Sequence, residues 1–238
     1  MKTKSVEKTV FFFITPSIIK NGRWAFCFFL RGTMNELEVS ISKSNSKMGA
    51  IPSISLPPII SCSKDACKFC GKKCYAKKIC RLRERTRKAY QRNFDIVTNN
   101  PTSYWSQVNG FLKGCHFFRF SVSGDILDYD YLLNIVNCAK NNKHCQILCF
   151  TKKFDLCNKY LSEHKSFPKN LHILFSGWVG LEMNNPHRLP EAHVMLRNGV
   201  TSAKDGAIYC SGNCFECATT NTGCWSMKKG QQVIFKEH

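Results

Sequence analysis

Short apolar runs alternate with stretches of helical spacing through the middle of the chain. The runs HFFRFSVSGD (116–125), CQILCFTK (145–152) and LHILFSGW (171–178) have the length and the Phe, Ile and Leu content of buried strands. Between them, residues 128–143 and 153–164 carry apolar side chains at helical spacing. Strands that alternate with helices predict a parallel sheet. The predicted fold class is α/β, either a partial (β/α) barrel or an open, mostly parallel sheet.

Extended segments precede this alternating core. Residues 9–14 and 24–31 have the apolar content of strands, and an Asn-Gly pair at 21–22 is typical of a turn between them. IPSISLPPII (51–60) is expected to be extended, because its prolines exclude a helix interior. This segment leads directly into a group of cysteines.

Helical and strand patterns continue toward the C-terminus. Residues 76–100 contain no Gly or Pro and predict one long helix, and residues 101–114 predict another. Residues 192–197 and 231–238 are expected to add strands. The predicted division is an N-terminal hairpin with a linker, a β/α core, and a Cys-rich segment packed on that core, at residues 1–48, 49–200 and 201–238.

Composition and charge narrow the class of protein. The chain has 238 residues and is 43% hydrophobic, which suffices for one sizeable α/β domain. It carries 35 Lys and Arg against 16 Asp and Glu, a net charge of +19 that favours a polyanionic partner such as nucleic acid. No apolar run approaches the ~20 residues that cross a bilayer, and no convincing signal peptide is present. We therefore expect a cytoplasmic protein without a membrane partner.

The chain has 15 cysteines, an unusual share for a cytoplasmic protein, and their spacing indicates metal binding. The first run, CSKDACKFCGKKCYA, is expected to place Cys62, Cys67, Cys70 and Cys74 within one short loop. This compression favours an iron–sulfur cluster of the 4Fe–4S type, because a zinc site usually joins two cysteine pairs across a longer spacer. Zinc and free thiols are the alternatives.

The number of ligands in the first run decides what the cluster can do. If Cys67 and Cys70 bind together with either Cys62 or Cys74, one iron stays open to a small molecule. If all four cysteines bind, the cluster is closed and serves for structure or electron transfer. Both arrangements are compatible with the spacing.

A second run lies in a Gly- and Cys-rich segment near the C-terminus, which is expected to form a loop. Cys210, Cys214, Cys217 and Cys224 alternate with turn-forming glycines, which predicts an auxiliary iron–sulfur cluster or a zinc site. A third alternative is that the two runs share ligands in one site. Five further cysteines have irregular spacing and are expected to pack as small apolar residues in the core: Cys115, Cys138, Cys145, Cys149 and Cys157.

Basic residues crowd the segment from Lys77 to Arg92. A helix there would expose most of them, either as a solvated face or as contacts to the phosphates of a nucleic acid. Asp125, after the strand at 116–125, is expected to cap the helix that follows. No Ser–His–Asp arrangement, phosphate loop or dinucleotide motif is visible in the sequence.

Two resemblances follow from these motifs. CSKDACKFC gives C-x4-C-x-Phe-C, which resembles the C-x3-C-x2-C loop of radical S-adenosylmethionine enzymes except in its first spacing. SVSGD (121–125) occupies the place of their Gly-rich motif. This resemblance implies a bound S-adenosylmethionine, an external reductant, and a cofactor pocket lined by Ser123, Gly124 and Asp125.

The second resemblance, to the phage gene product 88 family, extends from about residue 49 to the end of the chain. It rests on SLP before the first cysteines, CYA (74–76), AYQRN (89–93), FRFSVSGD (118–125), FTK (150–152) and the final cysteine run. It implies a cysteine-rich phage or prophage protein, and it places Arg92 and Asn93 in a shared motif near the cofactor. The sequence thus predicts a phage-type iron–sulfur protein, radical S-adenosylmethionine-like if it is an enzyme and of unknown substrate. The alternative is a zinc- or cluster-stabilised nucleic-acid-binding protein without catalysis.

Overall fold

Three consecutive apolar runs form the centre of a parallel sheet. The computed structural model describes residues 37–237, so the strands predicted at 9–14 and 24–31 lie outside the described residues. Strands β3 (Phe117–Phe120), β4 (Gln146–Thr151) and β5 (Leu171–Gly177) pair in parallel register. These are the strands that the apolar runs predict.

The described sheet has eight strands in the order β1-β2-β3-β4-β5-β6-β8-β7. Only β1 and β2 pair in the antiparallel sense; all the other described pairs are parallel. The outer strands are β1 (Ile41–Ser42), β2 (Ser53–Ile54), β6 (Glu191–Met195), β7 (Ile208–Tyr209) and β8 (Gln232–Lys236). The α/β fold is confirmed as an open, mostly parallel sheet that does not close into a barrel. Strands β2 to β6 follow chain order, so their carboxyl ends share one edge of the sheet.

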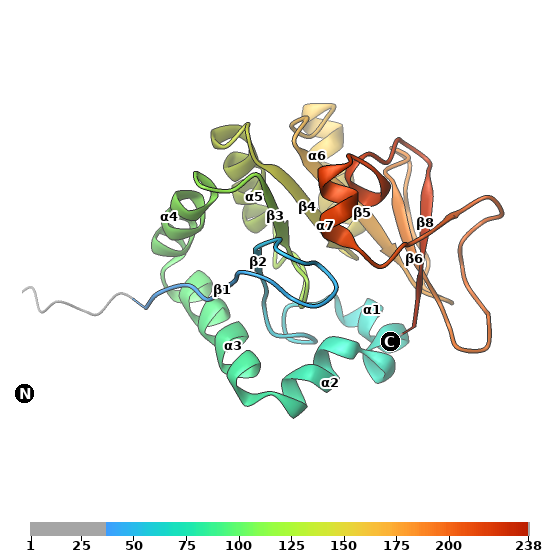
Figure 1. The fold of residues 1–238 in the computed structure, drawn as a ribbon, viewed down its shortest axis with the longest axis horizontal. Coiled ribbons are helices and arrows are strands. Elements are labelled where there is room, and N and C mark those ends of the chain that lie inside the picture. The colour runs from blue at the N-terminus through green and yellow to red at the C-terminus, as the bar shows by residue number, and fades with distance from the viewer. Residues whose placement is uncertain (1–36, 238) are drawn as a thin grey trace, which may run out of the picture. The chain divides into compact units, whose positions relative to one another are not determined.

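Helices cover one face of this sheet (Figure 1). Side chains that alternate along the strands, such as Phe118, Phe120 and Ile147, point into a core shared with the helices. Those helices are α3 (Glu84–Asn99), α4 (Pro101–Leu112), α5 (Tyr129–Asn141) and α6 (Phe154–His164). The five cysteines predicted as core residues are buried, which confirms that prediction.

The opposite face is covered by the Cys-rich C-terminal segment. Leu148, Leu174 and Val233 point to this side, where they form a core with Ala218 and Trp225. Ala218 belongs to α7 (Cys214–Thr219) and Trp225 to the short 3-10 helix η2 (Gly223–Trp225). The structure therefore places a helix and a strand, β7, in a segment that the sequence pattern predicts as loop.

The prediction of one helix over residues 76–100 is wrong. Helix α2 (Tyr75–Leu82) ends at Arg83, which has an extended backbone (φ −127°, ψ 93°), and α3 begins at the next residue. Figure 1 shows the two helices at an angle. Leu82, the last residue of α2, is 67% exposed and does not pack in the core at this bend.

Candidate metal centres

The first cysteine run lies at the carboxyl edge of the sheet, next to the end of β2. It forms two short helices in place of the expected loop, α1 (Lys64–Cys70) and the 3-10 helix η1 (Gly71–Lys73). Cys62 precedes α1, while Cys67 and Cys70 lie three residues apart and hence on one side of it. Cys74 is the residue before α2. We call these four residues the first cysteine group.

The thiols of the first cysteine group are near enough to influence one another. Burial raises the pKa of Cys62 to about 12, and the charges of Asp125, Cys67 and Cys74 act in the same direction. Burial also raises the pKa of Cys70, where the positive charge of Lys152 opposes it. Binding a metal at these thiols would therefore have to displace protons.

Gly124 brings the end of β3 against the turn that leads to Cys62. Its φ is +74°, and a Cβ atom there would lie 2.3 Å from Ser61 Oγ and 2.8 Å from Leu56 O. Ser61 Oγ accepts a hydrogen bond from the backbone N–H of Asp125 (3.2 Å) and donates to Pro57 O (2.7 Å). The close approach explains why glycine stands in the SVSGD motif.

Asp125 is buried, and it does not cap a helix as predicted. Its carboxylate accepts hydrogen bonds from Thr151 Oγ1 (2.6 Å) and the Lys152 backbone N–H (2.9 Å) at the end of β4. Burial raises the pKa of Asp125, and these hydrogen bonds partly oppose that effect. The cap of α5 is Asp128, whose side chain accepts from Tyr131 N at 2.8 Å.

Lys152 extends the site to the next strand. Its Nζ donates to Ser176 Oγ at the end of β5 (2.7 Å), and its charge acts on Cys70. Beyond β5, Gly180 lies against Phe69 of α1, since a Cβ there would be 3.3 Å from two ring carbons. On the other side Tyr75 donates a hydrogen bond to Val122 O. The first cysteine group thus spans the ends of β2 to β5.

The other predicted cofactor residues lie around this edge in different roles. Ser123 is buried and donates through its hydroxyl to Leu56 O (3.1 Å). Asn93 is buried in α3, where its side chain binds the backbone of Ser40 and Ser55. Arg92 is exposed on α3. The structure thus brings Ser123, Gly124 and Asp125 to the first cysteine group and places Asn93 behind them.

The second cysteine run forms a separate group on the sheet face opposite the large helices. Cys210 follows β7, Cys214 and Cys217 lie on α7, and Cys224 lies in η2. Asn213 begins α7, and its side chain accepts from Glu216 N (3.2 Å). We call these four cysteines the second cysteine group.

Backbone turns hold the second cysteine group together. Gly223 has a φ of +53°, and a Cβ there would lie 3.2 Å from Cys217 Sγ. Gly212 N donates to Cys210 Sγ at 3.4 Å. Burial raises the pKa of Cys224 to about 12; the charge of Arg119 lowers it and the other three cysteines raise it.

A scan against protein-family models matches residues 30–198 to gene product 88. The chain belongs to the gene product 88 family. The match contains the first cysteine group and ends before the second. No curated protein and no solved structure matches the chain.

Three of the motifs that carry the family resemblance meet at the first cysteine group of this gene product 88 protein. SVSGD supplies Asp125, FTK supplies Lys152, and CYA supplies Cys74 and Tyr75. Sequence reasoning missed the hydrogen bonds of Thr151 and Lys152 to Asp125 and of Lys152 to Ser176. The FTK landmark was the signal that could have found them.

Neither group is arranged around a single ion. Within residues 37–237, no three His, Cys, Asp or Glu side chains are placed so that they could hold one metal ion. A zinc ion at about 2.3 Å from each sulfur needs sulfur atoms about 3.8 Å apart. An iron–sulfur cluster separates its ligands further, because each thiolate binds a different iron.

The predicted basic segment is exposed in this gene product 88 protein. All eight of its Lys and Arg side chains are exposed: Lys77, Lys78, Arg81, Arg83, Arg85, Arg87, Lys88 and Arg92. Glu84 contacts Lys88 (2.9 Å) and Arg87 (3.7 Å). Tyr104 and Trp105 are buried, so they are not available to stack on bases. No helix between residues 37 and 237 is long and apolar enough to span a membrane.

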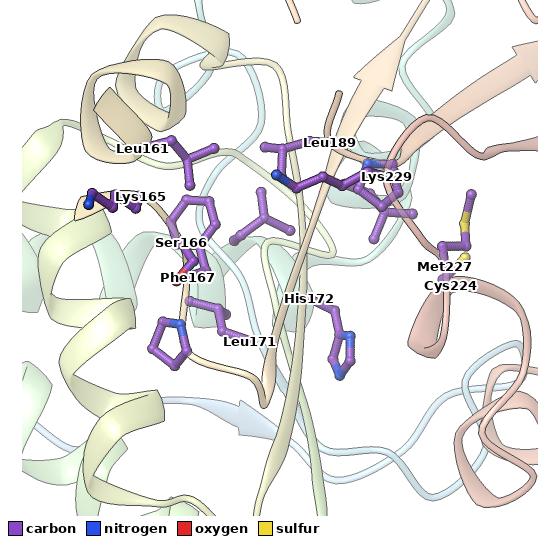
Figure 2. Close-up of a pocket in the computed structure, with 14 residues that line it drawn as sticks. Leu161, Lys165, Ser166, Phe167, Leu171, His172, Leu189, Cys224, Met227 and Lys229 are labelled. Carbon is purple, nitrogen blue, oxygen red and sulfur yellow. The ribbon is translucent and has the colours of Figure 1, made fainter. Parts of the chain in front are cut away.

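A small cavity of about 160 Å³ lies at the opposite edge, where β5 begins. Figure 2 shows Leu161, Lys165 and Phe167 on one side of it and Cys224 and Met227 on the other. Because the first cysteine group lies at the carboxyl ends of the strands, this cavity is not part of that site.

The structure also contains a hydrogen-bonded Ser–His–Glu chain that the sequence did not reveal. His193 Nδ1 lies 2.9 Å from the hydroxyl of Ser202, and Nε2 lies 3.0 Å from Glu191 Oε2. Gly177 on β5 leaves room for the ring, since a Cβ there would be 2.4 Å from Nδ1. These two hydrogen bonds hold the loop of residues 196–207 against β6.

Proposed function

We propose that this protein is an iron–sulfur protein that uses the first cysteine group for radical chemistry with S-adenosylmethionine. One observation carries the proposal: the group spans the carboxyl ends of consecutive parallel strands, together with Asp125, Lys152 and Ser176. In folds built from β/α units, ligands bind at this edge because the loops there converge. The strands in chain order, with large helices on one face, fit an opened β/α barrel.

The residues present fit such a cluster. Thiolates are its usual ligands, and Cys67, Cys70 and Cys74 come from one compact pair of turns. Lys152 brings a positive charge to Cys70, which favours an anionic thiolate centre. Cys62 is the fourth candidate.

The surrounding residues have definable roles at this edge. Asp125 uses its carboxylate to hold the Thr151–Lys152 turn and is therefore a positioning residue. Lys152 Nζ, held by Ser176, is placed to contact the carboxylate of a bound small molecule. When bound, the cluster would supply an electron, taken from an external reductant, for reductive cleavage of S-adenosylmethionine.

Anaerobic purification and reconstitution test this proposal. We expect a brown protein with iron and sulfide, an electron paramagnetic resonance signal after reduction, and a change in that signal on adding S-adenosylmethionine. Cys67→Ala with Cys70→Ala should abolish the first-site signal, whereas Cys115→Ala, a control at a core cysteine, should keep it. A colourless protein with stoichiometric zinc would refute the proposal.

A second candidate function is nucleic-acid binding by α2 and α3. The observation that favours it is the exposure of all eight basic side chains between Lys77 and Arg92, in a chain of net charge +19. Side chains of this kind bind backbone phosphates without reading sequence. The two functions are compatible, because a radical enzyme can act on a nucleic acid.

Titration of a labelled RNA or DNA oligonucleotide at two salt concentrations tests the second function. We expect affinity to fall steeply with salt, and the triple change Arg81→Gln, Arg85→Gln, Arg92→Gln to weaken binding further. Changing the exposed Lys140, Lys143 and Lys169 to Gln removes the same charge elsewhere on the surface. Equal effects of both triple variants would show that net charge alone is responsible.

A further inference from the structure

Arg119 is a buried cation that has no carboxylate partner among residues 37–237. It lies on β3, on the face that carries the second cysteine group, and is 9% exposed. Its guanidinium lies 4.4 Å from the Phe150 ring centroid, and Nη1 is 3.5 Å from Met48 Sδ. Within residues 37–237 it makes no salt bridge, and its Nε has no hydrogen-bond partner.

Such a cation requires a counter-ion. The guanidinium group keeps its charge at all ordinary pH values. Burying a charge without a partner costs several kcal/mol, so buried charges are normally paired. The cation–π contact with Phe150 offsets part of that cost. A negatively charged group near Arg119 would offset the rest of this cost, and cysteine side chains supply such a charge only after they lose their protons.

The second cysteine group is the neighbour that can become negative. Its four cysteines pack in the same core as Phe150 and Met48. Lys47 and Met48, which precede β2, connect Arg119 to the second cysteine group. Lys47 O accepts a hydrogen bond from Cys214 N (3.2 Å), and Met48 contacts Arg119. The charge of Arg119 also acts directly on Cys214 and Cys224.

We propose that the second cysteine group holds an anionic iron–sulfur cluster and that Arg119 is its built-in counter-ion. Four thiols that bind a cluster core of two positive charges release four protons and leave two negative charges on the centre, so the core and Arg119 together balance most of the thiolate charge. The inference rests on the proposed function, because it assumes that this protein binds iron–sulfur clusters, but it does not depend on the first cysteine group.

The experiment isolates the second group in the full-length chain. Cys67→Ser, Cys70→Ser and Cys74→Ser remove the first site, and iron and sulfide are reconstituted anaerobically at the second. The affinity for the cluster is measured as the chelator concentration that removes half of its absorbance. In this background Arg119→Met should weaken that affinity by about 10- to 100-fold, as losses of outer-shell partners do. Arg119→Lys keeps the charge and should recover most of the affinity. Lys228→Met removes an exposed charge four residues after Cys224 and should change the affinity less than twofold.

Thermal unfolding separates the counter-ion role from a packing role. Without metal, Arg119→Met should unfold at the same or a higher temperature than the parent, because it removes an uncompensated buried charge. With metal, its melting temperature should be lower than the parent's. If Arg119→Met lowers stability equally with and without metal, or leaves affinity within twofold, the proposal is wrong.

The outcome also separates this inference from the proposed function. A chain lacking Cys214 and Cys217, both replaced by Ser, retains the first group for iron reconstitution. Iron in that variant together with no metal in the isolated second site would overturn the counter-ion proposal and leave the proposed function standing. Metal at the second site with no iron at the first would do the reverse.

Discussion

At the scale of single residues, Gly124 determines whether β3 can approach the first cysteine group. Gly124→Ala would put a Cβ against Leu56 O and Ser61 Oγ, at a φ of +74°. We expect a loss of about 2–5 kcal/mol, the sum of left-handed strain and overpacking. Gly199→Ala is the control, because Gly199 has a φ of +82° with nothing within 4 Å, so it should cost about 1–2 kcal/mol. Urea unfolding of both variants measures the difference, and equal losses would contradict the contact argument.

Cys62 has the environment least suited to a thiolate in the first cysteine group. It is half-buried, and the charge of Asp125 raises its pKa, whereas the charge of Lys152 lowers the pKa of Cys70. We therefore expect Cys62→Ala to retain most of the reconstituted iron and Cys70→Ala to lose it. Iron and sulfide analysis after anaerobic reconstitution checks this. Equal loss in both variants would indicate four ligands and a closed cluster.

Glu191 gives the fold a defined response to acid. Burial acts to raise the pKa of Glu191, but hydrogen bonds from Asn185, His193 and Gln232 outweigh it and lower that pKa. A depressed folded pKa contributes stability that is present above the unfolded value of about 4.3 and is lost as pH falls through the folded pKa. Glu191→Gln should therefore be less stable than the parent at pH 7, and the gap should shrink at pH 3. Urea unfolding at both pH values measures it; a gap independent of pH would show that the charge is irrelevant.

At the scale of elements, the alternating core was predictable and the short helices within the cysteine runs were not. The strands and helices from 101 to 178 follow from local periodicity. Each helix there buries one face, and each strand is a short apolar run. The sequence around Arg83 contains no Gly or Pro that would predict the bend. The bend depends instead on how α2 and α3 pack against each other. Helix α7 had a sequence signal, since Asn213 and Glu216 stand at the spacing of an N-terminal cap.

Asn93 ties α3 to the two N-terminal strands of the described sheet. Its buried side chain donates to Ser40 O (2.9 Å) and Ser55 O (3.0 Å) and accepts from Ser40 N (2.7 Å). Asn93→Ala leaves these backbone groups without partners and should cost about 2–4 kcal/mol. Asn99→Ala, which removes an exposed side chain of the same helix, should cost less than about 0.5 kcal/mol. Similar unfolding free energies for the two variants would contradict this role.

At the scale of the whole molecule, the strand order explains why residues distant in sequence meet. Parallel strands in chain order bring Cys62, Asp125, Lys152 and Ser176 to one edge, although more than 110 positions separate the first from the last. The sequence predicted an α/β fold and both cysteine runs. It did not predict that they would occupy an edge and a face of the same sheet, because packing between remote segments decides that placement.

The helices of the Cys-rich segment bury few side chains. Helix α7 has six residues, and Ala218 and Trp225 are the residues of α7 and η2 that are buried. Helices this short are not stable alone, so a metal at the second cysteine group would act as the cross-link that keeps the segment folded. Chelation should then expose the segment without unfolding the remainder of the sheet.

Limited trypsin digestion tests that expectation directly. Removing metal should speed cleavage after the exposed Lys204 and Lys228, which flank the second cysteine group, and leave cleavage after the exposed Lys143 unchanged. Cys214→Ser with Cys217→Ser should reproduce the effect without chelator. Because β8 pairs with β6 and β7 inside the sheet, the nicked chain should stay associated until denatured. Cleavage that is faster at all three lysines would show that the metal stabilises the whole fold and not this segment alone.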